Sequence, residues 1–306
     1  MLFQAGLFKV HRVDATVIVV GNVIAGGAGK TPTVISIAQH LSARNLRVGV
    51  ISRGYGRDDR QMRGVDAASS PHQVGDEPLL IFKATHCPVF VGHSRYAAAR
   101  ALLDAHPDTQ VLLCDDGLQH YGLHRDLEVL VFDDRGIGNG WLLPAGPLRE
   151  PWPRGLVHRS GQAESRSIIL NTGKHAAFPG FVARRRLAAY AVSQAGERID
   201  LTSLTALAAQ RQKPLYAVAG LAQPAAFFDM LRALHLPIAG SLALPDHFDY
   251  RKLDLALGQR YTLLCTEKDA AKLWQTVPDA LAVPLIQSVD GDFWPALEAG
   301  IGLNSG

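Results

Sequence analysis

The sequence has few cysteines. Cys87, Cys114 and Cys265 are the three cysteines among 306 residues, and no two of them stand in a Cys-x-x-Cys spacing. An odd and scattered set excludes a disulfide framework and a structural zinc site. Such cysteine usage is typical of a protein in a reducing, cytoplasmic compartment.

Long hydrophobic runs are also missing. No run approaches the roughly 18 to 20 residues that cross a bilayer. The best candidate lies near the start, and it is interrupted by Lys9, His11, Arg12 and Asp14. We therefore expect neither a membrane-spanning helix nor a signal peptide.

The first twelve residues leave two interpretations open. Leu2, Phe3, Leu7 and Phe8 fall near one side of a possible short helix, and basic residues follow them. This pattern is typical of a helix that lies on a membrane surface. A frayed N-terminal turn packed on the domain fits the same residues.

Neither sign of charge is in large excess. The chain has 31 Lys and Arg against 28 Asp and Glu, which leaves a formal net charge of +3. A dedicated nucleic-acid binder is usually more basic, so we expect no nucleic-acid partner, whereas mild basicity suits an anionic ligand. Hydrophobic residues make up 47% of the chain, which excludes a disordered or coiled-coil protein.

What is present is an alternation of strands and helices. A length of 306 residues predicts about two domains at roughly 150 residues each. We expect an α/β fold: a P-loop NTPase-like parallel sheet with helices on both faces over 1–165, and a smaller second α/β domain over 166–306. The first domain is predicted from strands at 16–20, 47–52, 88–91, 111–115 and 127–132, with helices from 31 to 44, from 76 and from 94 to 105. The second is predicted from strands at 167–170, 181–192, 215–220 and 261–265, with helices at 224–235 and 293–299.

A glycine-rich run connects the first predicted strand to the first predicted helix. Its residues 26–31 read GGAGKT, the pattern of a P-loop, although Ile24 stands where the strict pattern has glycine. Backbone N–H groups would converge on phosphate oxygens, Lys30 would reach the β- and γ-phosphates, and the Thr31 hydroxyl would ligate Mg²⁺. A glycine-rich turn without function is the alternative. The predicted nucleotide-binding residues are Gly26, Gly27, Ala28, Gly29, Lys30, Thr31 and Pro32.

Two carboxylates follow a second strand. Asp115 and Asp116 end the run VLLCDD, and carboxylates at the end of a strand beside a P-loop can hold Mg²⁺ or its waters. The alternative is an ordinary surface turn. The pattern leaves open which of the two aspartates would ligate the metal directly.

Several further blocks carry a resemblance. Together with the P-loop they are similar, in order from about Val17 to about Trp274, to the tetraacyldisaccharide 4'-kinase family of the lipid A pathway. The blocks are GN at 21–22, SRGYG at 52–56, VGDEP at 74–78, DDGLQH at 115–120, GNGWLLPAGPLRE at 138–150 and TEKDA at 266–270.

The resemblance implies an activity and a location. It implies a kinase that uses ATP and Mg²⁺ to phosphorylate the 4'-hydroxyl of a tetraacyldisaccharide 1-phosphate, a lipid A disaccharide precursor, giving lipid IVA. It also implies a peripheral protein at the cytoplasmic face of the inner membrane, with the membrane surface as a partner and no predictable protein partner. Family members usually begin with a longer hydrophobic helix, which implies here a reduced surface contact or a truncated start.

The resemblance also assigns roles to residues. By position alone Asp76 is a helix cap, but the resemblance implies that it is the catalytic carboxylate, with Glu77 assisting at Mg²⁺. It implies that His247, from the second domain, pairs with Asp76 when that domain closes over the nucleotide cleft. Candidate contacts to the γ-phosphate or to the substrate are Arg149, Arg95, Asn139 and Gln119. For the two arginines, a surface salt bridge is the alternative.

Other classes of protein share a P-loop. A molecular switch of the GTPase or ATPase type, or a metallochaperone, would use the same loop for conformational work. The sequence lacks a guanine-reading motif, because Lys268 is directly followed by Asp269, and it lacks a Cys/His cluster. A non-catalytic nucleotide-binding scaffold is less favoured, because loss of catalysis generally relaxes some of the acidic and basic residues retained here.

Overall fold

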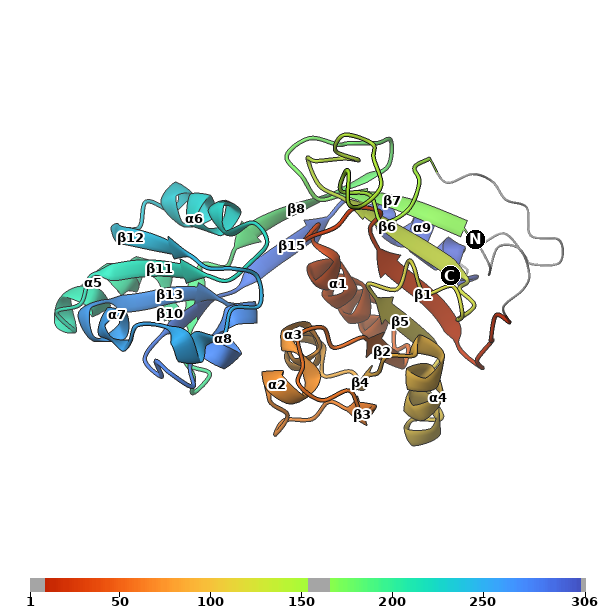
Figure 1. Ribbon diagram of the computed structural model, residues 1–306, viewed down its shortest axis with the longest axis horizontal. Coiled ribbons are helices and arrows are strands. Elements are labelled where there is room, and N and C mark those ends of the chain that lie inside the picture. Colours follow the sequence, from red (N-terminus) through yellow and green to blue (C-terminus); the bar gives the residue numbers. More distant parts are fainter. Residues whose placement is uncertain (1–8, 154–165, 304–306) are drawn as a thin grey trace. The chain divides into compact units, whose positions relative to one another are not determined.

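The structure is a computed structural model that describes residues 9–153 and 166–303. The chain divides into two compact units, the first formed by residues 1–69, 73–184 and 287–306 and the second by 70–72 and 185–286. Each unit has its own sheet (Figure 1). The expected short helix at the start falls mainly on residues 1–8, outside the described residues.

The first unit is built on a nine-stranded sheet with the order β15-β8-β7-β6-β1-β5-β2-β4-β3. The strand β1 lies at its centre and pairs in parallel with β5 and with β6. The strands are β1 Thr16–Gly21, β2 Val48–Ser52, β3 Arg63–Gly64, β4 Val89–Val91, β5 Val111–Asp115, β6 Leu127–Phe132, β7 Arg166–Asn171, β8 Phe181–Leu187 and β15 Leu285–Val289. The helices are α1 Lys30–Ala43, α2 Pro71–Val74, α3 Asp76–Thr85, α4 Arg95–Ala105 and α9 Phe293–Gly300.

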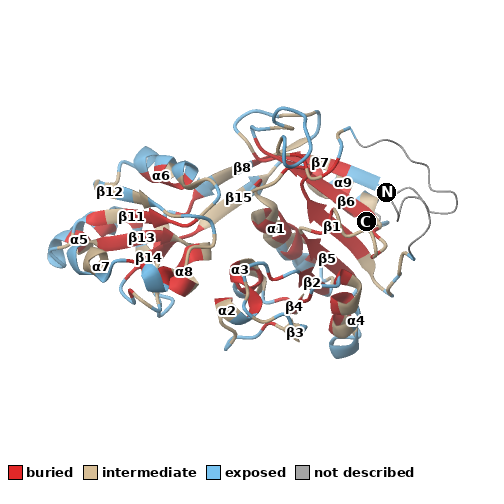
Figure 2. Ribbon diagram, viewed as in Figure 1, coloured by how far each residue is buried: buried red, intermediate tan, exposed pale blue. Residues whose placement is uncertain are grey.

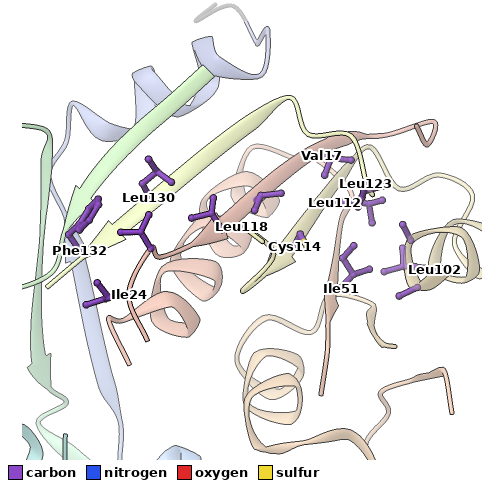
Figure 3. Packing of buried hydrophobic residues seen from close by; sticks show 14 of the residues in the cluster. Val17, Ile24, Ile51, Leu102, Leu112, Cys114, Leu118, Leu123, Leu130 and Phe132 are labelled. Atoms are coloured by element: carbon purple, nitrogen blue, oxygen red, sulfur yellow. The ribbon is translucent and has the colours of Figure 1, made fainter. Parts of the chain in front are cut away.

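The central strands are almost entirely buried, which explains their continuous apolar sequence. Every residue of β2, β5 and β6 is buried (Figure 2). One core cluster joins the central strands to α4, and Figure 3 shows Val17, Leu112 and Leu102 among its members. The expected P-loop NTPase-like α/β fold is therefore confirmed.

The second unit contains a six-stranded sheet with the order β10-β9-β14-β13-β11-β12. The strands β11, β12, β13 and β14 pair in parallel, whereas β9 and β10 pair antiparallel. Its strands are β9 Tyr190–Val192, β10 Arg198–Asp200, β11 Leu215–Ala219, β12 Ile238–Ala243, β13 Thr262–Thr266 and β14 Leu281–Val283. Its helices are η1 Leu201–Ser203, α5 Leu204–Gln210, α6 Pro224–Ala233, η2 Tyr250–Lys252, α7 Leu255–Arg260 and α8 Glu267–Leu273.

The division of the chain differs from the boundary expected after residue 165. The strand β7 belongs to the first sheet, because it pairs with β6 in parallel from Arg166 to Asn171. Residues 287–306 also belong to the first unit. Gly300 lies so close to β6 that a Cβ added to it would be 2.9 Å from the Leu127 side chain. The first unit is thus discontinuous in sequence.

The structure also describes the cysteines and the lengths of the helices. Cys87, Cys114 and Cys265 are buried free thiols. Within residues 9–153 and 166–303, no helix combines the length and the apolar character that crossing a bilayer requires.

Candidate active site

The phosphate loop connects β1 to α1. Gly26 and Gly29 have φ angles of 94° and 88°, a left-handed backbone that favours glycine, and Gly29 caps the helix. The carbonyl of Gly29 accepts hydrogen bonds from the Thr33 backbone N–H and from Thr33 Oγ1, at 3.2 and 2.9 Å. The helix begins at Lys30, one residue earlier than expected, so Lys30 and Thr31 both lie in its first turn.

Lys30 is folded back onto its own loop. Its Nζ donates to Asn22 Oδ1 at 3.1 Å and to the carbonyl of Gly26 at 3.4 Å, and it lies 3.7 Å from Asp116 Oδ1. Its side chain is 10% exposed. The ammonium group therefore connects the phosphate loop to the acidic end of β5.

Asn22 is a site residue to which the sequence assigned no role. It is fully buried, and its Nδ2 donates to the carbonyl of Gly26 at 3.3 Å. Its own carbonyl accepts from Gln119 Nε2 at 3.2 Å. The available signal was its position at the end of β1, directly before the glycine-rich run.

The two aspartates after β5 have different surroundings. Asp115 is buried, and its Oδ2 accepts from Ser52 Oγ of the neighbouring strand β2 at 3.1 Å, whereas its Oδ1 has no hydrogen-bond partner. Asp116 has a φ angle of 46°, and both of its carboxylate oxygens accept from Nη1 of Arg149, at 2.8 and 3.0 Å.

The pKa values of the two carboxyls shift in opposite directions. Burial, together with the charges of Glu77 and Asp116, raises the pKa of Asp115 to about 7. Although burial acts in the same direction on Asp116, the charges of Lys30 and Arg149 outweigh it and hold the pKa of Asp116 below its ordinary value. At neutral pH Asp116 is ionised, whereas Asp115 is close to its midpoint.

The donor set fits a hard divalent cation such as Mg²⁺. Asp115 offers a buried oxygen without a hydrogen-bond partner, and Glu77 is close enough to raise the pKa of Asp115. In the described part of the chain, no three His, Cys, Asp or Glu side chains form a group that could hold a metal ion. A cation here would need the Thr31 hydroxyl and nucleotide phosphate oxygens to complete its shell.

Arg95 has other partners than the expected phosphate. It is 3% exposed, and its guanidinium donates to the backbone carbonyls of Gly92 at 3.3 Å, Asp115 at 3.2 Å and Asp116 at 3.5 Å. This geometry holds the backbone turn that presents the two aspartates.

A buried polar network lies beside Arg149. Glu150 is 8% exposed and accepts from Gln119 Nε2 at 2.9 Å and from the Tyr121 hydroxyl at 2.6 Å. Gln119 Oε1 in turn accepts from Arg149 Nη1 at 3.5 Å. In the same turn, burial and the charges of nearby arginines lower the pKa of His120 to about 4. The sequence assigned no role to Glu150, Tyr121 or His120.

The remaining predicted residues lie in three places. Asp76 and Glu77 open α3, where Gly75 with a φ angle of 94° precedes them and Asp76 is 5% exposed. A carboxylate is favourable at a helix N-terminus. Asn139 is engaged within its own loop, where it donates to the carbonyl of Ala145 and accepts from the Trp141 backbone N–H, both at 3.1 Å. His247 belongs to the second unit, and its pairing with Asp76 stays a prediction.

These features together define a P-loop nucleotide-binding protein. They are a mostly parallel sheet, a glycine loop before a helix, a lysine in the first turn of that helix and an acidic pair at the end of the neighbouring strand. Residues 1–301 match the model of the family described as tetraacyldisaccharide-1-P 4'-kinase. The chain belongs to this family, and the resemblance in its motifs is confirmed.

Relatives and a solved structure agree with this assignment. The tetraacyldisaccharide 4'-kinase of Polaromonas naphthalenivorans is 51% identical over 302 residues, covering 97% of this chain and 84% of the relative. That of an Acidovorax strain is 50% identical over 300 residues, with the same two shares covered. A crystal structure of the "apo" form of LpxK from Aquifex aeolicus in complex with ATP superimposes with a TM-score of 0.76 at 27% identity, covering 98% of this chain and 92% of that one.

Proposed function

We propose that the chain transfers the γ-phosphoryl group of ATP to the 4'-hydroxyl of a tetraacyldisaccharide 1-phosphate. Family membership supports a kinase with this class of lipid acceptor. The observation that carries the proposal is the position of Lys30, which opens α1 and lies 3.7 Å from Asp116 Oδ1 at the end of β5. ATP as the donor is supported by the solved relative, which was crystallised with ATP.

The nucleotide phosphates take the place of internal contacts in this proposal. Lys30 now donates to Asn22 and to the Gly26 carbonyl, and its ammonium would turn from these oxygens to the β- and γ-phosphates. The first-turn N–H groups of α1 and the loop residues 26–29 would bind the same phosphates. Transfer of a phosphoryl group depends mainly on positioning and on charge stabilisation, which these groups provide.

Mg²⁺ fits the acidic end of β5. Thr31, Asp115, Asp116 and Glu77 would hold the ion or its waters, and the ion would neutralise charge on the phosphate oxygens. The unpaired, buried Asp115 Oδ1 supports a direct role for Asp115. Asp116 is already bound by Arg149 and lies beside Lys30, so we assign it to the orientation of these two cations.

The acceptor hydroxyl is assigned to Asp76. As a buried carboxylate at the start of α3, Asp76 would orient the 4'-hydroxyl and accept its proton. His247 from the second unit would pair with Asp76 when that unit closes over the nucleotide. Closure would then complete the site only with substrate bound.

The lipid's phosphate and sugar need contacts of their own. Arg149 is 26% exposed, so its guanidinium can exchange Asp116 for a phosphate oxygen, and Gln119 beside it can contact the sugar. Because Arg95 and Asn139 are engaged with backbone groups, we assign them to positioning. A peripheral site at the cytoplasmic face of the inner membrane suits a lipid acceptor with a nucleotide donor.

The test is a transfer assay. The protein is incubated with [γ-³²P]ATP, Mg²⁺ and a tetraacyldisaccharide 1-phosphate in mixed micelles, and the labelled lipid bisphosphate is resolved by chromatography. We expect a labelled 4'-phosphate with ATP and none without the lipid. Nucleotide hydrolysis that proceeds equally without lipid, and without lipid labelling, would contradict the kinase and favour a P-loop switch.

A further inference from the structure

Three consecutive large hydrophobic residues are exposed in the loop after β6. Trp141, Leu142 and Leu143, which we call the apolar tip, are 66%, 46% and 56% exposed. The other exposed large hydrophobics among the described residues are isolated in sequence: Tyr55, Met62, Leu234 and Leu255. Scattered exposed side chains of this kind need no explanation, but a contiguous group does.

The loop that carries the apolar tip is internally bonded. The backbone N–H of Leu143 donates to the carbonyl of Leu148 at 2.9 Å, and the N–H of Leu148 donates to the carbonyl of Trp141 at 3.0 Å. Asn139 bonds across the loop to Ala145 and Trp141. The exposure of the tip therefore belongs to a defined loop conformation.

The base of this loop is bonded to the phosphate loop. The Ala25 N–H donates to the carbonyl of Pro147, and the Arg149 N–H donates to the carbonyl of Val23, both at 2.7 Å. At the other end of the loop, Arg135 donates to the carbonyls of Ala25 and Gly27, at 3.2 and 3.1 Å. A partner that binds the apolar tip would thus also fix the distance between itself and the phosphate loop.

The loop that carries the apolar tip is uncharged, and charged residues lie at its base. Residues 136–148 contain no charged side chain. The exposed Lys174 and His175 lie in the connection between β7 and β8, which is held against the base of the loop because the His175 N–H donates to Asp134 Oδ1 at 2.8 Å. An uncharged apolar tip can enter the headgroup region of a bilayer without desolvating a charge, while Lys174 at the base of the loop can stay near anionic headgroups.

We propose that the apolar tip inserts into the headgroup region of an anionic phospholipid bilayer. The proposal rests on the proposed function, since an acceptor with four acyl chains resides in a membrane. Three side chains bury a few hundred Å² at most, well below the roughly 1,000 Å² of a specific protein interface. Trp prefers the membrane–water interface, and Leu side chains extend into the acyl region. At about 3.3 Å per residue, the five steps along the chain from Leu143 to Leu148 span no more than about 17 Å, so insertion keeps the phosphate loop near the headgroups.

The test compares two double variants of the full chain. Leu142→Asp with Leu143→Asp removes the apolar tip, and Leu234→Asp with Leu255→Asp changes two equally exposed leucines of the second unit. Binding to vesicles of phosphatidylethanolamine and phosphatidylglycerol, without acceptor lipid, is measured by cosedimentation. We expect the first variant to bind at least about tenfold more weakly and the second to bind like the parent. Equal binding by both variants, or weakening only when residues 1–12 are removed, would overturn the proposal.

Trp141 itself gives a second readout. Brominated phospholipids quench tryptophans that enter the bilayer, and the parent protein should be quenched on vesicle binding. Trp141→Phe should abolish this quenching, although Trp152, Trp274 and Trp294 remain. Quenching that persists in Trp141→Phe would place another tryptophan in the bilayer and contradict the proposal.

These measurements separate the surface from the enzyme. Melting curves and ATP affinity check that the Asp variants fold. With acceptor lipid in vesicles, the tip variant should raise KM for the lipid and leave KM for ATP unchanged, and a water-soluble short-chain acceptor should be phosphorylated at the parent rate. Tip-dependent vesicle binding by a protein without transfer activity would refute the proposed function alone. Transfer activity with tip-independent binding would refute the membrane surface alone.

Discussion

Lys30 is the residue on which we expect phosphoryl transfer to depend most directly. Its ammonium is the cation of the phosphate loop and lies beside Asp116. We expect Lys30→Ala to keep its melting temperature within a few degrees and to lose about 10²- to 10³-fold or more in rate, because it removes charge stabilisation. Lys83→Ala, at an exposed position of α3, is the matched control. A parent-like turnover in Lys30→Ala would exclude this phosphate site.

Asp76 and Asp116 are expected to fail in different ways. Asp76→Ala should lose about 10²- to 10⁴-fold in kcat with little change in ATP affinity, because a general base acts on the acceptor. Asp116→Ala should instead raise KM for ATP, because Lys30 and Arg149 lose the carboxylate that orients them. Initial rates over a grid of ATP and Mg²⁺ concentrations distinguish the two. Loss of ATP binding in Asp76→Ala would show that the roles are exchanged.

Asp115 should make Mg²⁺ binding depend on pH. The pKa of this carboxyl is raised to about 7 by burial and by Glu77 and Asp116, so a proton competes with the ion below that pH. With a non-hydrolysable ATP analogue bound, we expect Mg²⁺ affinity to rise by up to tenfold per pH unit below about 7 and to level off above it. Calorimetry at pH 5.5 to 8.5 checks this, and Asp115→Asn should flatten the profile.

The same shift affects the stability of the protein without a metal ion. A carboxyl whose folded-state pKa lies above its ordinary value binds its proton more tightly in the folded state. The stability from Asp115 is therefore complete below pH 4 and is lost as the pH rises through about 7. Urea unfolding of parent and Asp115→Asn at pH 5 and pH 8 should show a smaller decrease for the variant.

At the scale of elements, the phosphate-loop helix α1 is held by a helix from the other end of the chain. Glu298 of α9 is buried, and its Oε1 contacts two side chains of α1 and its C-terminal cap. His40 Nε2 lies 2.9 Å from this oxygen, and Arg44 Nε lies 3.3 Å from it. Trp294 stacks on His40 with ring centroids 4.1 Å apart. Gln287 of β15 adds a hydrogen bond of 2.9 Å to Thr33 Oγ1 in the first turn of α1.

This junction should contribute to stability. Glu298→Ala leaves the His40 ring and the Arg44 guanidinium without their shared acceptor, and we expect it to lower the free energy of unfolding by about 1–3 kcal/mol. Glu197→Ala, at an exposed position of the second unit, should change it by less than about 0.5 kcal/mol. Urea titrations of both variants provide the measurement. Equal effects would mean that the junction adds nothing.

These elements also show what could be predicted from the sequence. Gly29, Lys30 and the strand before them form a local pattern, so the start of α1 was predictable to within one residue. The role of Arg95 was not, because its partners at Asp115 and Asp116 are set by the sheet and not by neighbours in sequence. That residues 287–306 belong to the first unit could not be predicted for the same reason, since Glu298 and its partner His40 are 258 positions apart in the sequence.

For the whole molecule, we expect two separate contacts with the membrane. The first twelve residues remain a predicted surface contact, with basic residues after Leu2, Phe3, Leu7 and Phe8. If both contacts act, removing residues 1–12 or changing the apolar tip should each weaken salt-sensitive vesicle binding, and the combination should abolish it. Cosedimentation at 0.05 and 0.5 M NaCl tests this in the presence and absence of residues 1–12. Undiminished binding by the combined variant would require a third surface.

The discontinuous first unit has a consequence for how the protein is made. Residues 185–286 are made before Gln287, so the second unit can be complete while the first still lacks most of β15 and all of α9. At the usual 5 to 20 residues per second, synthesis of residues 185–286 separates the two parts of the first unit by roughly 5 to 20 s. During that interval α1 has no Glu298 to bind, and β8 is the outermost strand on that side of the first sheet. A chain truncated after Ile286 should therefore contain a protease-resistant second unit and bind no nucleotide, so that nucleotide binding appears only after Gln287 and the residues that follow it are made.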